Sequence, residues 1–314
     1  MPTQTAARSE APAPSPERGA YFHLLVVYVV WGSTFVAMRA AVMGDSGFKP
    51  FSVGASRLAV ASLLLFAWAI LRKVPLRLSR RDLWVSAVSG VVIWVTGNGF
   101  TMWAEQTVDA GYAALVFSTV PIWTALIGNM IDRRLPSARL CGAFVVAIAG
   151  MAVLGGSGLF HAGTHLLKPT LVILSGTVLW GMTTHLQKRL PIHGPLFVSS
   201  AYQQFFGALG FFLMVLIMGE PWPHPTRQAW FAWGYLVLFG SIIAYSSYIA
   251  VVRKFPATIA MTFAYVCPVL AVLFGALLLK ETISPNKIVG MGMILGAVYL
   301  IFKEQRVAKK QLRL

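Results

Sequence analysis

The chain has 314 residues, of which 57% are hydrophobic and only 11% are charged, and its mean hydropathy is +0.70. Because soluble domains carry about 25% charged residues, this composition excludes a soluble globular protein and predicts a polytopic membrane protein. The formal net charge of +16 does not indicate nucleic-acid binding, since the basic residues lie between the apolar runs and form no single patch.

The two ends of the chain are polar. Residues 1–20 are rich in Ala and Pro and cannot bury a core, so we expect a disordered cytoplasmic tail there. They do not resemble a signal peptide, because the apolar run that follows is too long and lacks a cleavage site of small residues. Residues 304–314 are expected to form a basic cytoplasmic tail.

Between these ends the chain is a series of apolar runs joined by short connections. A membrane-spanning helix needs about 20 apolar residues. The sequence therefore predicts an all-α membrane protein with ten transmembrane helices, at residues 22–43, 50–71, 83–105, 109–131, 138–156, 169–188, 196–218, 229–252, 256–279 and 285–302.

The distribution of Lys and Arg predicts the orientation. Basic residues gather in alternate connections, for example at Arg80-Arg81 and Arg133-Arg134, and at Lys309-Lys310 near the end of the chain. The intervening connections hold few, such as Lys49 and Lys168. Cytoplasmic loops carry the excess of positive charge, so we expect both termini in the cytoplasm.

Two halves of the chain, 21–157 and 168–303, repeat the same pattern about 147 residues apart. Each half holds five predicted helices. Because five is odd, the second half enters the membrane from the opposite side, which predicts inverted repeats like those of many secondary transporters.

One polar stripe appears in both halves. Trp94, Asn98 and Thr101 share one face of the third predicted helix, and Glu105 extends that face. The equivalent positions in the eighth predicted helix are occupied by Ser241, Tyr245 and Tyr248. Polar groups are costly in hydrocarbon, so we expect both stripes to line a substrate cavity. Hydrogen bonding between helices, without a ligand, is the alternative.

Further candidate substrate-binding residues repeat in the first and sixth predicted helices. Trp31 and Thr34 match Trp180 and Thr183, and each Trp is followed by Gly. The Trp rings offer flat binding surfaces, while the alternative is close packing of helices.

Matching prolines interrupt two other helices. Pro121 and Pro268 each remove a backbone hydrogen bond and are predicted gating hinges. One turn earlier, Tyr265 occupies the position equivalent to Ser118 and is added to the candidate substrate-binding residues. The alternative is that prolines are simply frequent in membrane helices.

Arg57 and His185 are two residues within predicted helices whose roles the sequence leaves open. Arg57 is about two turns into the second helix, where a buried Arg costs about 3 kcal/mol. A structural role, a side chain that reaches outward, and contact with an anion or carboxylate all stay open. For His185, near the end of the sixth helix, a role in proton coupling and a role only in packing both stay open.

Motifs for catalysis and metal binding are missing. Cys141 and Cys267 lie inside apolar runs, so we expect neither a disulfide nor a metal site. No HExxH or phosphate-binding loop is present, and we expect no carboxylate deep in any helix. We therefore expect no enzyme and no cofactor, and a membrane-bound enzyme or scaffold is the weakest hypothesis.

Small residues recur in the fifth and tenth predicted helices, at Ala143 and Ala147 and at Gly292 and Gly296. This spacing indicates close helix contact, either within the bundle or in a dimer. The oligomeric state stays open.

Four short motifs occur together in the chain: Trp31-Gly32-Ser33-Thr34, Pro50 to Arg57, Pro121 with Asp132 to Pro136, and Pro268 with Lys280 to Ser284. With these motifs, residues 22–303 resemble the drug/metabolite transporter superfamily, EamA type. The first half departs from the family pattern, because Asp132 stands where the second half has Glu281.

The resemblance implies a central cavity and export of small metabolites, prominently amino acids, through a multi-pass protein of the bacterial cytoplasmic (inner) membrane. Phosphate cargo is disfavoured, since only Arg39 and Arg57 could face such a cavity. The neutral and aromatic stripe suits neutral or aromatic amino acids, with membrane lipid as the surroundings. A multidrug exporter of low specificity is the alternative.

Overall fold

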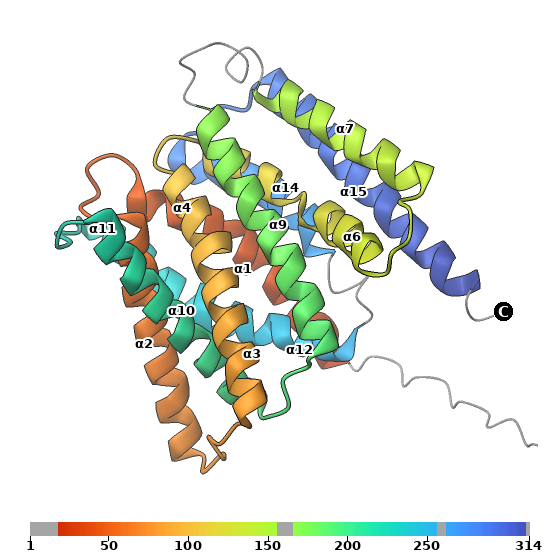
Figure 1. The fold of residues 1–314 in the computed structure, drawn as a ribbon. Coiled ribbons are helices and arrows are strands. Elements are labelled where there is room, and N and C mark those ends of the chain that lie inside the picture. The colour runs from red at the N-terminus through yellow and green to blue at the C-terminus, as the bar shows by residue number, and fades with distance from the viewer. Residues whose placement is uncertain (1–17, 156–165, 256–261, 312–314) are drawn as a thin grey trace, which may run out of the picture.

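The computed structural model describes residues 18–155, 166–255 and 262–311. Helices lie in every predicted apolar segment, and the described residues contain no strand (Figure 1). The first half comprises α1 (Arg18–Val42), α2 (Pro50–Leu71), α3 (Arg80–Val91), η1 (Val92–Gly99), α4 (Phe100–Ala104), α5 (Ala110–Phe117), α6 (Val120–Ile131) and α7 (Ala138–Gly155). The second half comprises α9 (Leu167–Arg189), α10 (Leu196–Met218), α11 (Arg227–Tyr235), η2 (Leu236–Ala244), α12 (Tyr245–Lys254), α14 (Phe263–Leu279) and α15 (Pro285–Gln311).

Six helical stretches in the described residues are long and apolar enough to cross a membrane. Apolar side chains such as Leu213, Leu216 and Ile217 of α10 are exposed on the outside, as lipid-facing residues are. The all-α membrane class is therefore confirmed, whereas the count of ten spans and the cytoplasmic termini stay predictions. Most of the predicted N-terminal tail lies outside the described residues. α15 continues through residues 304–311, where we expected a tail.

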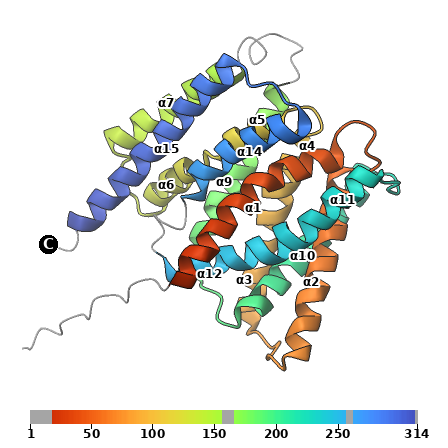
Figure 2. The ribbon, with the colours of Figure 1, turned by 180° about the vertical axis from the view of Figure 1, so that it is seen from behind.

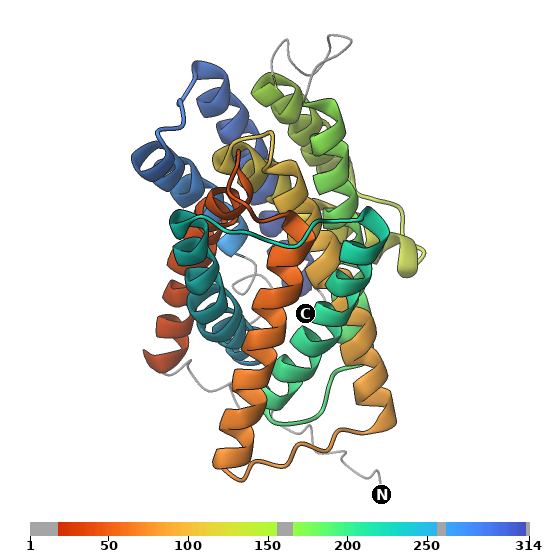
Figure 3. The same ribbon diagram turned by 90° about the vertical axis from the view of Figure 1, so that its left-hand side faces the viewer.

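Helix contacts in the two halves follow one pattern. α2 packs on α10 and α7 on α15, so each of these helices contacts its own counterpart. α1 packs on α14 as α9 packs on α6, and α1 packs on η2 as α9 packs on η1. Figure 3 shows α2 and α10 side by side. This exchange of partners is what two repeats related by a two-fold axis produce.

The directions of the helices agree with this pattern. α1 and α9 run in opposite directions through the bundle (Figures 1 and 2). The paired α7 and α15 lie at the periphery, beside the other helices (Figure 2). Ala143 and Ala147 of α7 are buried, while a Cβ on Gly292 or Gly296 of α15 would meet open space.

Wide π-helical turns occur at related places in the two halves. η1 continues α3 into α4, and η2 continues α11 into α12. Such turns are rare, are found mostly inside α-helices, and occur frequently at functional sites. η1 approaches α9 closely because Gly176 has no side chain, and a Cβ there would lie 2.3 Å from the Thr96 carbonyl oxygen.

A largely buried ionic cluster, of which Asp109 is the most exposed member, joins four elements at one end of the bundle. Arg39 of α1 forms ion pairs with Glu281 (3.2 Å) and Asp109 (3.6 Å), and Lys287 of α15 also pairs with Asp109. Glu281 accepts hydrogen bonds from the backbone N–H groups of Ala110 and Gly111, at the beginning of α5. A carboxylate is favourable at a helix N-terminus, where free N–H groups and the helix dipole meet it.

The position equivalent to Glu281 in the first half is Asp132. Asp132 pairs with Arg189 at 3.5 Å, but both side chains are about 60% exposed. The same position in the repeat therefore makes a buried, multiply bonded ion pair in one half and a solvent-exposed pair in the other.

We predict that Glu281→Ala strongly destabilises the protein. The change leaves Arg39 short of a buried partner and uncaps α5, and removal of one member of a buried pair costs about 3–5 kcal/mol. Thermal unfolding of the purified protein in detergent measures the effect. Asp132→Ala is the matched control and should cost about 0–1 kcal/mol. Equal unfolding temperatures for the two variants would contradict this account.

We also predict that Gly176→Ala destabilises the contact between α9 and η1 by about 1–3 kcal/mol, because the new Cβ meets backbone that cannot move aside. Gly142→Ala in α7 is the control, since nothing lies within 4 Å of its added Cβ. Unfolding in detergent compares the two variants. A Gly176→Ala protein as stable as Gly142→Ala would show that the contact is looser than described.

Candidate substrate cavity

A cavity lies in the middle of the bundle, lined by residues of α1, α2, η1, α4, α5, α6, α9, η2, α12 and α14. Most of its lining is apolar. The aromatic lining residues are Trp31, Phe35, Trp94, Phe117, Trp180, Tyr245 and Phe263. Smaller apolar residues complete the walls: Met38, Ile93, Gly97, Ala114, Val120, Gly240, Ala264, Cys267 and Pro268. The polar lining residues are Thr34, Arg57, Asn98, Thr101 and Ser118.

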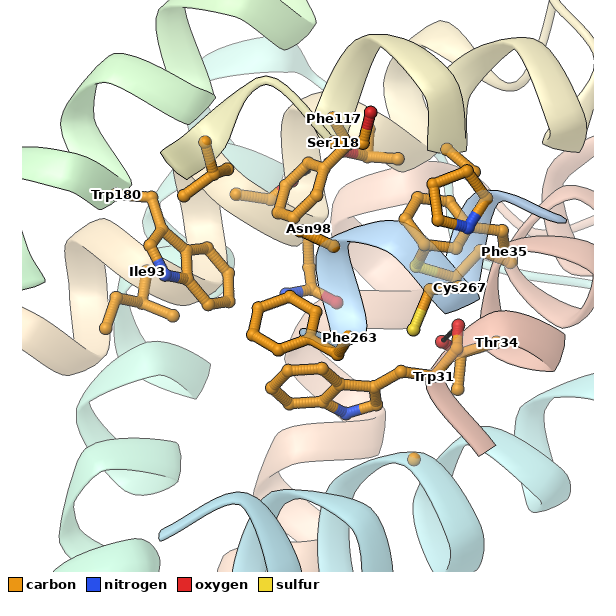
Figure 4. Close-up of a pocket in the computed structure, with 18 of the residues that line it drawn as sticks. Trp31, Thr34, Phe35, Ile93, Asn98, Phe117, Ser118, Trp180, Phe263 and Cys267 are labelled. Carbon is orange, nitrogen blue, oxygen red and sulfur yellow. Dashed lines mark hydrogen bonds between the residues drawn. The ribbon is translucent and has the colours of Figure 1, made fainter. Parts of the chain in front are cut away.

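The aromatic rings contact one another around the cavity. Trp31 packs edge-on against Phe263, with ring centroids 5.0 Å apart, and Phe117 packs edge-on against Trp180 at 5.4 Å. Figure 4 shows these four rings around the centre of the cavity, with Asn98 extending toward Phe263 and Trp31. Edge-to-face contacts fix the rings and leave flat apolar faces on which another ring could stack.

Three of the polar lining groups are already satisfied by their own helices. The hydroxyls of Thr34, Thr101 and Ser118 donate to the carbonyl oxygens of residues one turn earlier, at 2.6–2.7 Å. These hydroxyls therefore have only acceptor capacity left. Among the polar lining residues, Asn98 and Arg57 have donors still available, and the indole N–H of Trp94 is also buried without a partner.

Arg57 is held by its neighbours on the cavity wall. Its side chain is 2% exposed, and the guanidinium carbon lies 5.3 Å from the centre of the Trp94 ring. Trp94 in turn packs on Tyr245, with centroids 4.9 Å apart. The Tyr245 hydroxyl donates to Gln203 at 2.6 Å, which fixes the far end of this stack.

Eight predicted site residues line the cavity: Trp31, Thr34, Trp94, Asn98, Thr101, Trp180, Tyr245 and Pro268. Five others are not among its lining residues: Thr183, Ser241, Tyr248, Tyr265 and Pro121. Tyr248 lies directly behind the wall, because its ring packs on Trp31 with centroids 4.8 Å apart. The carbonyl of Ser241 accepts from Gln204, and the Thr183 hydroxyl donates to Leu179 of its own helix.

The two predicted hinge prolines have different settings. Pro121 lies in the first turn of α6, after the chain has left α5 at Ser118 and Thr119, so the helix is divided before the proline. Pro268 lies inside α14. Because proline has no N–H, the carbonyl of Ala264 loses its usual helical partner. Both Ala264 and Pro268 line the cavity.

The sequence did not reveal several lining residues. Phe35, Phe117 and Phe263 are apolar residues in apolar helices, and nothing in the sequence separates them from residues that face lipid. The sequence marks Arg57 as an unusual charge within an apolar helix, but it does not show which residues surround the side chain. His185 lies outside the lining and bonds the carbonyl of Thr124 on α6 through Nε2, at 2.8 Å.

Glu105, at the C-terminal end of α4, is a deeply buried carboxylate. This side chain is 0% exposed, and neither carboxylate oxygen has a hydrogen-bond partner. Its carbonyl accepts from Nη1 of Arg39 at 2.7 Å. The turn that follows α4 is covered because α1 and α14 bring Arg39 and Glu281 over it. Apolar segment lengths do not reveal such a tertiary cover.

Comparisons with known proteins agree with this architecture. The model of the EamA-like transporter family matches residues 18–156 and again residues 167–303. The chain is 31% identical over 282 residues to the uncharacterized inner membrane transporter YedA of Escherichia coli, covering 88% of this chain and 89% of that protein. It is 23% identical to an S-adenosylmethionine/S-adenosylhomocysteine transporter of Chlamydia trachomatis, covering 91% and 90%.

A crystal structure of similar fold superposes with a TM-score of 0.65 at 20% identity, covering 90% of this chain and 97% of that one. At this identity the likeness shows the fold alone. The family and the named relatives are transporters and not enzymes. Two family matches that fill both halves, together with the central cavity, lead to one conclusion: the chain belongs to the EamA-like transporter family and is a multi-pass membrane transporter of small metabolites.

Proposed function

We propose that the chain is a secondary transporter of the bacterial inner membrane that exports neutral amino acids, above all aromatic ones, by alternating access through the central cavity. The observation that carries this proposal is the composition of the cavity wall. Seven aromatic side chains surround a small number of polar groups, of which Asn98 and Arg57 still have donors available. This suits a ligand with an aromatic body and one polar end.

The ammonium group of an amino acid also finds acceptors in this wall. The carbonyl of Ala264 lacks its helical partner because of Pro268, and both residues line the cavity. The faces of the Trp rings attract cations. The compounds named for the Chlamydia relative, S-adenosylmethionine and S-adenosylhomocysteine, are themselves amino acids that carry an aromatic base. They have the same combination of groups.

Alternating access is supported by the ionic cluster and by the repeats. Arg39, Asp109, Glu281 and Lys287 join α1, α5, α14 and α15 at one end of the bundle. Opening that end requires these pairs to separate. Because the helices of the two repeats exchange partners in the same pattern, equivalent movements of the two halves could open the two ends in turn.

A multidrug exporter is the second candidate, and the aromatic lining favours it. Many drug exporters handle organic cations, for which a carboxylate in the cavity is the natural partner. The described lining residues include one cation, Arg57, and no carboxylate. This charge favours zwitterions and anions over cations, so the amino-acid proposal is preferred.

Uptake of radiolabelled amino acids into proteoliposomes, with and without a pH gradient, tests the proposal. We expect saturable uptake of aromatic or neutral amino acids that unrelated organic cations do not inhibit. Inhibition by many unrelated cations would establish the multidrug function instead. If none of the amino acids is taken up, the proposed substrate class is wrong.

We predict that Asn98→Ala and Tyr245→Ala each reduce amino-acid uptake about tenfold or more, since each removes a polar or stacking contact at the cavity. Tyr299→Ala is the control, because Tyr299 of α15 is 59% exposed and lies outside the lining. Thermal unfolding shows that the variants are folded. Wild-type uptake by both cavity variants would remove this cavity from the transport path.

A further inference from the structure

We propose that Arg57, assisted by Asn98, forms a subsite that binds the carboxylate of the transported molecule. This inference rests on the proposed function, because it assigns one end of the substrate to one end of the cavity. It also makes a claim that the aromatic lining alone does not make, namely that an anionic group is required.

The guanidinium of Arg57 has unused hydrogen-bond donors inside the protein. Nη2 lies 3.5 Å from Oδ1 of Asn98, at the outer limit of a hydrogen bond. Nε and Nη1 are buried and have no hydrogen-bond partner. Guanidinium carries five N–H donors. A buried cation with unpaired donors is costly, so the site is prepared for an acceptor that the protein itself does not supply.

Protein carboxylates do not fill this role in the part of the chain that the structure describes. Glu105 is buried nearby and acts on Arg57 electrostatically, yet the two side chains form no ion pair. Arg39, the other candidate cation, is occupied by Glu281 and Asp109. Arg57 is therefore the basic residue of the described lining that has room for an external anion.

The fold does not itself require a cation at this position. In the second half, the equivalent residue is Gln204 of α10, which is fully buried and is not among the lining residues. Its Nε2 donates to Oγ of Ser200 at 3.0 Å and to the carbonyl of Ser241 at 3.1 Å. A neutral amide thus completes the packing in one repeat. Arg57 in the other repeat packs on Trp94, and its side chain lines the cavity with a charge that this packing does not need.

The stack with Trp94 orients the guanidinium. Trp94 lies between Arg57 and Tyr245, so the plane of the guanidinium is restricted before a ligand arrives. A planar guanidinium matches the two oxygens of a carboxylate. Since the described lining offers a single cation, a monoanionic carboxylate is a better match than a phosphate dianion. The aromatic body of the ligand would then lie among Trp31, Phe117 and Phe263.

The test compares L-phenylalanine with L-phenylalaninamide, which keeps the ring and the ammonium group but lacks the carboxylate. Each compound competes with uptake of a radiolabelled aromatic amino acid into proteoliposomes. For the wild-type protein we expect phenylalanine to inhibit at about tenfold or more lower concentration than the amide. For Arg57→Gln we expect the two inhibition constants to agree within about twofold.

Two further variants separate binding from folding. Arg57→Lys keeps the charge but loses the paired donors, so we expect intermediate discrimination. Arg227→Gln is the matched control: Arg227 also lies over an aromatic ring, that of Phe231 at 5.6 Å, but it is exposed and outside the lining. We expect Arg227→Gln to discriminate as the wild type does.

A preference for phenylalanine that survives in Arg57→Gln would overturn the subsite. An equal weakening of inhibition by phenylalanine and by its amide in Arg57→Gln would also overturn the subsite, because loss of a purely structural Arg57 would weaken both compounds alike. If the wild type takes up no amino acid, the proposed function fails, and thermal stabilisation decides the subsite separately. In that case 3-phenylpropionate should raise the unfolding temperature of the wild type, and 3-phenylpropionamide should not. Neither compound should raise the unfolding temperature of Arg57→Gln. If Arg57→Gln does not fold, Arg57→Lys replaces it, and 3-phenylpropionate should stabilise Arg57→Lys less than the wild type. Equal stabilisation by the two compounds would refute carboxylate recognition.

Discussion

The lack of water in the hydrocarbon region is the constraint on which the rest of the structure depends. Every polar group placed there needs a partner inside the protein. The hydroxyls of Thr34, Thr101 and Ser118 meet this requirement with carbonyls of their own helices. Arg57 does not, and its donors remain on the cavity wall. Trp94 and Glu105 also hold buried polar atoms without a hydrogen-bond partner, but Arg57 is the charged residue of the described lining. Its unmet donors, inside an aromatic enclosure, turn the cavity into a candidate binding site.

The two repeats share their packing but differ in their chemistry. Helix contacts exchange partners between the halves, which provides two equivalent bundles around one cavity. The specific groups are distributed unequally. Glu281 is a buried cap on α5 while its equivalent Asp132 is exposed, and Arg57 faces the cavity while its equivalent Gln204 donates two hydrogen bonds within the packing. In the proposed transport cycle the symmetric packing allows the movement, and Arg57, which has no charged equivalent in the other repeat, gives the cavity its charge.

The sequence predicted the helices well because apolar length depends on local composition alone. The stripe of Trp94, Asn98 and Thr101 was also predictable, since helical spacing places these residues on one face. Phe117 and Phe263 were not, because an apolar side chain toward a cavity looks the same in sequence as one toward lipid. The burial of Glu105 depends on Arg39 and Glu281, which are distant in sequence, and so could not be read from the chain.

The central claim is that the substrate passes through the cavity. Chemical labelling of Cys267 tests this claim most directly. This cysteine lines the cavity, and the other cysteine, Cys141, is exposed and can be replaced by Ser. The measurement is the rate at which a small membrane-impermeant thiol reagent labels Cys267 in proteoliposomes, with and without an aromatic amino acid. The account predicts labelling that the amino acid slows in a saturable manner. Labelling at the same rate with and without a transported amino acid would contradict it.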